Sequence, residues 1–219
     1  MFDSPTEAAN QWWSNRGYYH PMRDLPKSPD TAPCRAALEV ATEYYSPALL
    51  NHSLRSYIWA AAYAADQGIA FDDELLYVSA VVHDIGLVRE FDNATIPFED
   101  AGGHVAWVLT AGAGWPAARR TRAAEVIVRH MWAEVDVAAD PEGFLLERAT
   151  GLDISGRNAD DFSAEFRSAV LRRYPRLDLA AEFAACFRDQ AARKPESRAA
   201  TMVSSGIDGR LAANPLERD

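Results

Sequence analysis

The chain has 219 residues, 48% of them hydrophobic and 25% charged, which is ordinary globular composition and excludes an extensively disordered protein. The formal net charge of −10 argues against a nucleic-acid partner, because phosphate binding depends on clustered Lys and Arg side chains. No apolar stretch approaches the roughly 20 residues that span a bilayer, and we find no secretory leader, so we expect a cytoplasmic protein without a membrane partner.

The first 30 residues place aromatic side chains among several prolines, which predicts one short helix followed by an extended segment. We expect this N-terminal extension, residues 1–30, to pack on the core, although its aromatic rings could also cap a pocket. His20 directly precedes Pro21, where the chain is biased toward extended structure, and we interpret it as structural or exposed.

From Asp30 onward, apolar residues recur at helical spacing between residues that typically cap helices. Because no alternating strand pattern accompanies them, we predict an all-α domain over residues 31–193. The adjacent Gly102 and Gly103 indicate either close packing or a helix that begins after them. The predicted helices run from about residue 30 to 45, 47 to 66, 73 to 85, 98 to 111, 116 to 130, 142 to 151, 159 to 173 and 178 to 192.

The end of the chain, residues 194–219, combines prolines and glycines with weak apolar periodicity. This composition predicts a loosely packed or disordered tail. One short helix, or an arm that holds a dimer partner, are the alternatives.

The histidines supply the strongest chemical signal. His83-Asp84 alone fits a hydrogen-bonded core histidine followed by a helix-end carboxylate, but four helical histidines that could converge on a bundle interior favour a metal. Asp84 and Asp153 add carboxylates, and imidazole with carboxylate suits zinc, iron or manganese. The four histidines within predicted helices are His52, His83, His104 and His130.

These residues stand in a recognisable order. The segment Asn51-His52-Ser53-Leu54-Arg55-Ser56-Tyr57, then His83-Asp84-Ile85-Gly86 and then Asp153, resembles the signature of the HD-domain metal-dependent hydrolase superfamily. Two more segments, 97–103 and 124–130, look most like its cyanamide hydratase-like branch, and the resemblance covers about residues 40 to 160. It implies an all-α HD-domain helical bundle with a metal site in its core, and a homodimer is a further expectation from it.

The resemblance also implies a ligand set for one divalent transition metal, with Zn²⁺ expected and Fe or Mn as alternatives. Asp136 or Asp140 could take the place of Asp153, the last ligand in sequence order. His104 could build a second metal site or pocket with His130, or be a packed structural residue. The implied ligands are His52, His83, Asp84 and Asp153.

The implied reaction is hydration or hydrolysis of a small nitrile-like molecule such as cyanamide by metal-bound hydroxide, giving urea. We predict Asp84 and His130 as the catalytic residues: Asp84 accepts the water proton, and His130 acts as the acid or orients the substrate. Arg55, Leu87 and Trp107 are the predicted pocket residues, while Glu99 and Glu125 are expected to be solvated or to lie behind the site.

Two other functions stay open. The first is an HD phosphohydrolase that acts on a nucleotide or phosphodiester, with Arg55 or Arg89 supplying positive charge. Leu87 disfavours it, because many phosphodiester-cleaving relatives have a lysine at that position. The second is a non-catalytic helical metal-binding protein.

Overall fold

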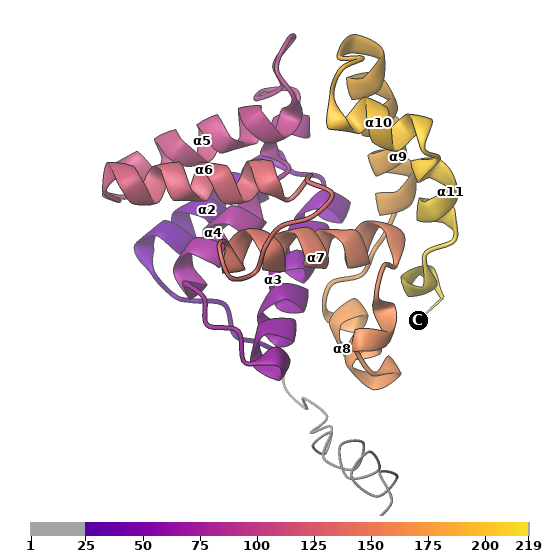
Figure 1. Ribbon diagram of the computed structural model, residues 1–219, viewed down its shortest axis with the longest axis horizontal. Helices are drawn as coiled ribbons and strands as arrows, with labels where there is room; N and C mark the ends of the chain where they lie inside the picture. The colour runs from indigo at the N-terminus through magenta and orange to yellow at the C-terminus, as the bar shows by residue number, and fades with distance from the viewer. Residues whose placement is uncertain (1–24, 219) are drawn as a thin grey trace, which may run out of the picture.

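The computed structural model describes residues 25–218, so the predicted N-terminal extension, with His20, lies almost entirely outside the described residues. Across that range the chain forms helices and no strand, which confirms the predicted all-α class (Figure 1). The helices are α2 (Ala32–Tyr44), α3 (Pro47–Gln67), α4 (Asp73–Val82), α5 (Phe98–Gly112), α6 (Ala117–Arg129), α7 (Pro141–Ser155), α8 (Ala164–Arg173), α9 (Leu179–Arg193), α10 (Arg198–Ser204) and α11 (Ile207–Ala212), with short 3-10 turns η1 (Ile85–Leu87), η2 (Ala159–Asp161) and η3 (Pro215–Glu217).

The helix ends follow from the capping residues in the sequence. Side-chain oxygens of Ser46, Asp72 and Asp140 accept the backbone N–H three residues on, at 3.1, 3.0 and 2.7 Å, and begin α3, α4 and α7. Gly68 and Gly156 end α3 and α7 with φ of 67° and 71°, in the left-handed region that glycine adopts without strain. Capping therefore sets where the central helices begin and end.

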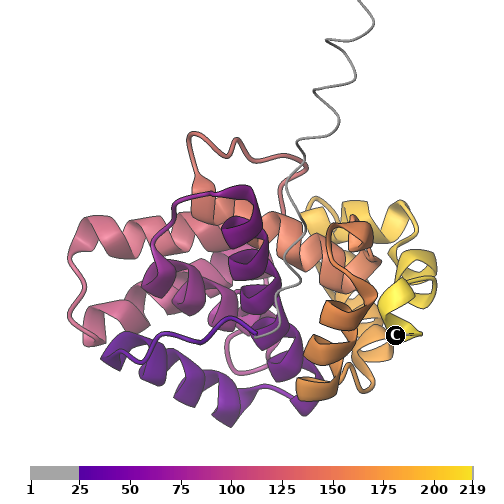
Figure 2. The same cartoon turned by 90° about the horizontal axis from the view of Figure 1, so that it is seen from below.

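The helices pack into one bundle with α3 and α7 in contact at its centre. The antiparallel pair α5 and α6 lies on one side of them, and α9, α10 and α11 lie on the opposite side (Figures 1 and 2). Trp59 of α3, Ile127 of α6 and Phe187 of α9 are fully buried, so a continuous apolar core joins the two sides. Within the described range no helix is both long and apolar enough to cross a membrane.

Two glycines allow the turn after α4 to lie directly against α5. A Cβ on Gly86 would sit 2.1 Å from the carbonyl oxygen of Phe98, and one on Gly102 would sit 3.0 Å from the carbonyl oxygen of His83. The first distance leaves no room for a side chain, and the second would require the His83 backbone to shift by a few tenths of an ångström. The sequence offered two explanations for the pair Gly102 and Gly103. Because α5 begins at Phe98, before both, and because Gly103 approaches Ala124 of α6 as Gly102 approaches His83, close packing is confirmed.

The tail differs from the sequence prediction. Residues 198–212 form α10 and α11, which pack on α9 and α7, and Ile207, Leu211 and Leu216 are buried. Asn214, also fully buried, donates a hydrogen bond of 2.9 Å to the backbone oxygen of Asp153. The expectation of a loosely packed tail is corrected, because each short helix buries only one or two apolar residues and so leaves no periodic pattern.

Candidate functional site

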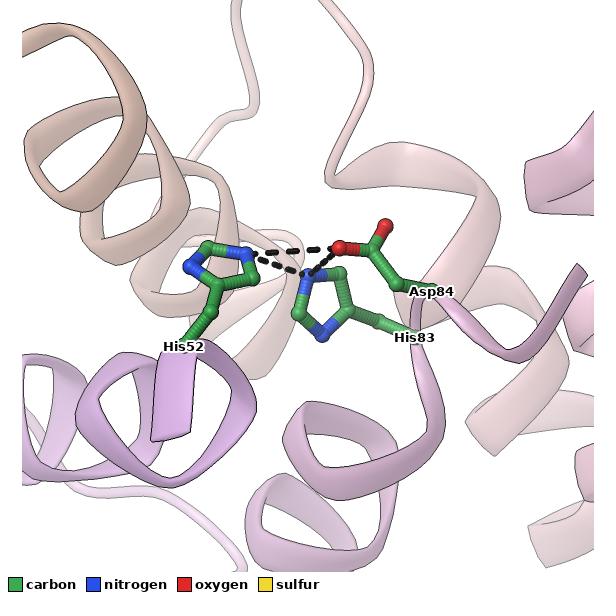
Figure 3. Close-up of side chains that lie close together, drawn as sticks. All are labelled: His52, His83 and Asp84. Carbon is green, nitrogen blue, oxygen red and sulfur yellow. Dashed lines mark hydrogen bonds and ion pairs between the residues drawn. The ribbon is translucent and has the colours of Figure 1, made fainter. Parts of the chain in front are cut away.

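Three polar side chains from two helices meet in the interior. His52 lies in the second turn of α3, His83 ends α4, and Asp84 follows it, and all three are fully buried (Figure 3). The Nε2 atoms of the two imidazoles are 3.2 Å apart, and they lie 3.3 and 3.1 Å from Oδ2 of Asp84. One ligand atom from each residue lies within 4.8 Å of the others, which is the spacing of a metal-binding cluster.

Hydrogen bonds on the far side of each ring fix which nitrogen faces the cluster. Nδ1 of His83 is 2.7 Å from the backbone oxygen of Ala80. A carbonyl oxygen only accepts, so that Nδ1 carries the proton. Nδ1 of His52 is 2.7 Å from Oδ2 of Asp153, which is likewise an acceptor. With one proton on each ring, both Nε2 atoms would point unshared electron pairs at the same place. Burial opposes a second proton on His52, but hydrogen bonds to Asp153 and Asp84 raise its pKa, so a proton on Nε2 competes with a cation there.

Asp84 makes the cluster a candidate cation site. Neither carboxylate oxygen has a hydrogen-bond donor among residues 25–218, although both are buried. Burial opposes the charge, and only positive charge at the neighbouring His83 and His52 side chains holds the pKa of Asp84 well below its usual range; with neutral rings, a bound cation would supply that charge. A buried, unpaired carboxylate beside two imidazole acceptors is costly unless a cation completes the group. Two imidazoles and one carboxylate fit a divalent transition metal and leave positions open.

Asp153 is not brought into this cluster. Its carboxylate accepts 2.8 Å hydrogen bonds from Nε and Nη2 of Arg55 and a 2.9 Å bond from Nε1 of Trp59, in addition to the contact with His52 Nδ1. Burial opposes ionisation, but Arg55 and His52 keep the pKa of Asp153 well below normal. The side chain therefore faces the back of the His52 ring, opposite the nitrogen that faces the cluster.

His130 reaches the same place from the end of α6. Its ring centroid is 4.8 Å from that of His83, and its Nε2 is 3.9 Å from Oδ1 of Asp84. Nδ1 contacts the backbone oxygen of Ile127, so this ring also presents an unprotonated Nε2 to the site. Burial, with repulsion from His83, lowers the pKa of His130 to about 3. The imidazole is neutral at pH 7 and can accept a proton or a hydrogen bond there.

Other predicted site residues lie elsewhere. His104 is exposed on α5, beside a shallow surface groove. Trp107 is 38% exposed, and Cζ of Arg120 lies 4.3 Å from the centroid of its ring. Leu87 packs on the core, and Arg55 is buried behind Asp153.

Of the remaining acidic residues, Asp140 caps α7 and pairs with Arg129, and Asp136 accepts from the backbone of Ala138. Neither lies with the His52 cluster. Glu125 pairs with Arg129 at 3.6 Å on the surface, whereas Glu99 is 2% exposed, so Glu99 is not solvated.

A cavity of about 390 Å³ opens above the cluster, and His52, His83 and His130 line it. Met131, Trp132 and Ile154 form part of its wall. The other wall comes from α9, α10 and α11, whose residues the sequence did not single out. In the sequence, the spacing of Phe183 and Phe187, four residues apart on one helical face, was the one indication that α9 turns an apolar face inward. The missed cavity residues of these helices are Phe183, Phe187, Arg198, Thr201, Met202 and Arg210.

The chain is similar to known proteins. The family model described as HD domain matches residues 49–148, which include His52, His83 and Asp84. Cyanamide hydratase DDI2 and Cyanamide hydratase DDI3 of Saccharomyces cerevisiae are each 31% identical to this chain over 177 residues. The alignment covers 79% of this chain and 79% of either relative. The helices that form the second cavity wall, α9 to α11, lie beyond the matched HD segment.

Proposed function

This chain belongs to the HD domain family and to its cyanamide hydratase-like branch, and from that premise we propose that it is a metal-dependent hydratase acting on a nitrile-like molecule such as cyanamide. The observation that carries the proposal is the pair of Asp84 oxygens without a hydrogen-bond donor in the described part of the chain, beside two imidazoles that line a cavity. Function is assigned here from that site, since HD-type bundles as a fold do not determine a substrate.

His52, His83 and Asp84 would hold the metal, for which Zn²⁺ is our first choice and Fe or Mn the alternatives. When bound, a divalent cation lowers the pKa of a coordinated water to about 7 and so makes a nucleophile available at neutral pH. In this proposal Asp153 is not a ligand. It orients His52 through Nδ1, as carboxylates behind metal-binding histidines commonly do.

The protein's own groups handle the proton. Asp84 Oδ1 and His130 Nε2, 3.9 Å apart, are both acceptors and can receive hydrogen bonds from one water between them. That water attacks the nitrile carbon, and His130 takes its proton and returns one to the substrate nitrogen. The product of cyanamide is urea, with no leaving group. His130 thus acts first as a base, because its neutral ring has no proton on the nitrogen that faces the site.

An HD phosphohydrolase is the second candidate. The observation that favours it is the presence of arginines in the cavity wall, Arg198 and Arg210 among them, since guanidinium groups pair well with phosphate. Leu87 counts against it, because that side chain packs on the core and supplies no charge. Two further proposals are a homodimer, which depends on the family resemblance, and a cytoplasmic location, which depends on the sequence composition.

The test is a paired assay of protein reconstituted separately with zinc, iron and manganese. Urea formation from cyanamide, lost in Asp84→Asn, supports the hydratase. Release of phosphate from a nucleotide or cleavage of bis(p-nitrophenyl) phosphate, with no urea from cyanamide, would instead assign the phosphohydrolase. A protein that binds metal but turns over neither class would be a binding protein.

A further inference from the structure

The cavity is too large for cyanamide alone. Cyanamide has three non-hydrogen atoms and displaces about as much space as two or three water molecules, each of which takes roughly 30 Å³ in the liquid. The cavity above His52 and His83 measures about 390 Å³, within the range of sites that enclose whole organic ligands. Most of its volume would be left unfilled by cyanamide, so its walls are informative about a larger substrate.

One part of the wall is apolar and rigid. Phe183 and Phe187 of α9 stack on each other with ring centroids 4.5 Å apart, and both rings line the cavity. Met202 of α10 and Ile154 of α7 continue this surface. Such a wall favours a ligand with an apolar body, because contact removes apolar area from water on both partners.

A second part of the wall is cationic. Arg157, Arg198 and Arg210 line the cavity, and Glu147, which also lines it, pairs with Arg157. Among residues 25–218, Arg198 and Arg210 have no carboxylate at ion-pair distance, and the buried Glu99 is close enough to Arg198 for a weaker interaction. The cavity lining therefore has two positive charges in excess, in a chain whose formal net charge is −10.

Each arginine makes contacts beside the cavity, with Arg210 partly buried and Arg198 exposed. Arg210 donates to the backbone oxygen of Ser205 at 2.6 Å, and Arg198 lies over the Trp132 ring at 5.8 Å from its centroid. Arg198 shares its face of α10 with Thr201 and Met202, three and four residues on, which also line the cavity. A planar guanidinium with free donors is suited to binding an anionic group of a ligand.

We propose that the substrate is a substituted cyanamide or nitrile with a short apolar body and an acidic group at the end remote from His52 and His83, where Arg198 and Arg210 bind it. This inference depends on the proposed hydratase function and specifies its substrate class. For a substituted cyanamide the reaction is R–NH–C≡N + H₂O → R–NH–C(=O)–NH₂. One water adds across the triple bond, and nothing is oxidised or released.

Two synthetic substrates of equal size separate charge from bulk. Carboxymethylcyanamide carries a carboxylate, and isobutylcyanamide has methyl groups in place of the two carboxylate oxygens. We expect kcat/KM of the metal-loaded protein to be at least about tenfold higher for the carboxylate, as for a hydrogen bond to a charged group. Calorimetric binding of the products, carboxymethylurea against isobutylurea, should show the same preference without turnover.

Arg198→Gln should lower the ratio of kcat/KM for the charged over the neutral analogue by about tenfold. It should change kcat/KM for cyanamide by less than about twofold, since cyanamide does not reach that wall. Arg198→Lys should restore part of the ratio. Arg172→Gln, an exposed arginine of α8 that does not line the cavity, is the matched control and should change nothing.

The outcomes distinguish the two proposals. Turnover of cyanamide with equal efficiency for the charged and neutral analogues, unaffected by Arg198→Gln, would overturn this inference while the hydratase function stands. No turnover of any cyanamide, with hydrolysis of adenosine monophosphate that Arg198→Gln weakens, would overturn both and assign the arginines to phosphate.

Discussion

Replacing Asp153 by Asn separates an orienting carboxylate from a metal ligand. Asn keeps the size of the side chain but removes its charge and one acceptor oxygen. In the structure the two oxygens accept from Arg55, Trp59 and His52 at 2.7 to 2.9 Å, and the whole group is fully buried. In Asp153→Asn these donors compete for a single oxygen, and the proton on His52 Nδ1 loses its anionic partner.

Two magnitudes follow. Removing one member of a buried ion pair leaves the Arg55 charge uncompensated, which typically costs about 3 to 5 kcal/mol of unfolding free energy. Losing the partner behind a metal-binding histidine typically lowers metal affinity by about 10- to 100-fold, or about 1.4 to 2.8 kcal/mol. We therefore expect Asp153→Asn to be clearly destabilised yet still to bind the metal at a higher concentration.

Urea denaturation and competition with a chromophoric chelator measure these two quantities on the same protein. Asp160→Asn, an exposed carboxylate on η2, is the matched control and should match the wild type in both. Asp153→Asn that folds but holds no metal, as expected of a lost ligand, would refute the orienting role. An unchanged metal affinity would show that the hydrogen bond from His52 to Asp153 does not affect metal binding.

Three more outcomes are expected. Burial raises the pKa of Glu99 from 4.5 to about 7, so the folded protein binds this proton more tightly than the unfolded chain. The free energy of unfolding should therefore fall by about 3 kcal/mol as pH rises from below 4.5 to above 7. Thermal unfolding across pH should show this slope in the wild type and lose it in Glu99→Gln. His130→Gln should retain stoichiometric metal but lose about 100-fold or more in kcat for cyanamide, whereas unchanged kcat would remove His130 from the mechanism. Gly86→Ala should destabilise the fold by about 1 to 3 kcal/mol or more because its Cβ meets the Phe98 backbone, and Gly112→Ala, with nothing within 4 Å, should not.

The fold was largely predictable because its signals are local. Capping residues and prolines marked the first residue of several helices to within one or two positions, as at Ser46-Pro47, Asp72 and Pro116. The tail was not predictable in the same way. Asn214 is buried against the end of α7, and Leu216 lies beside residues of α8. Short helices that depend on such distant partners carry no periodic pattern of their own.

The site shows the same division between local and tertiary information. His52, His83 and Asp84 were predicted from the order of motifs, and the structure brings them together. The position of Asp153 was not predictable, since the spacing of residues along the chain does not say which face of an imidazole a carboxylate meets. Arg198 and Arg210 were missed because they lie in the tail and enter the cavity only through the packing of α10 and α11.

Metal content tests the central claim most directly. The wild-type protein and His83→Ala would be purified without added chelator, dialysed against metal-free buffer, and measured by inductively coupled plasma mass spectrometry and circular dichroism. We predict close to one zinc, iron or manganese ion per wild-type chain, and loss of that ion in His83→Ala with its helical spectrum retained. A wild-type protein that binds none of these ions after reconstitution, or a His83→Ala variant that retains its metal, would contradict the assignment of His52, His83 and Asp84 as a metal centre.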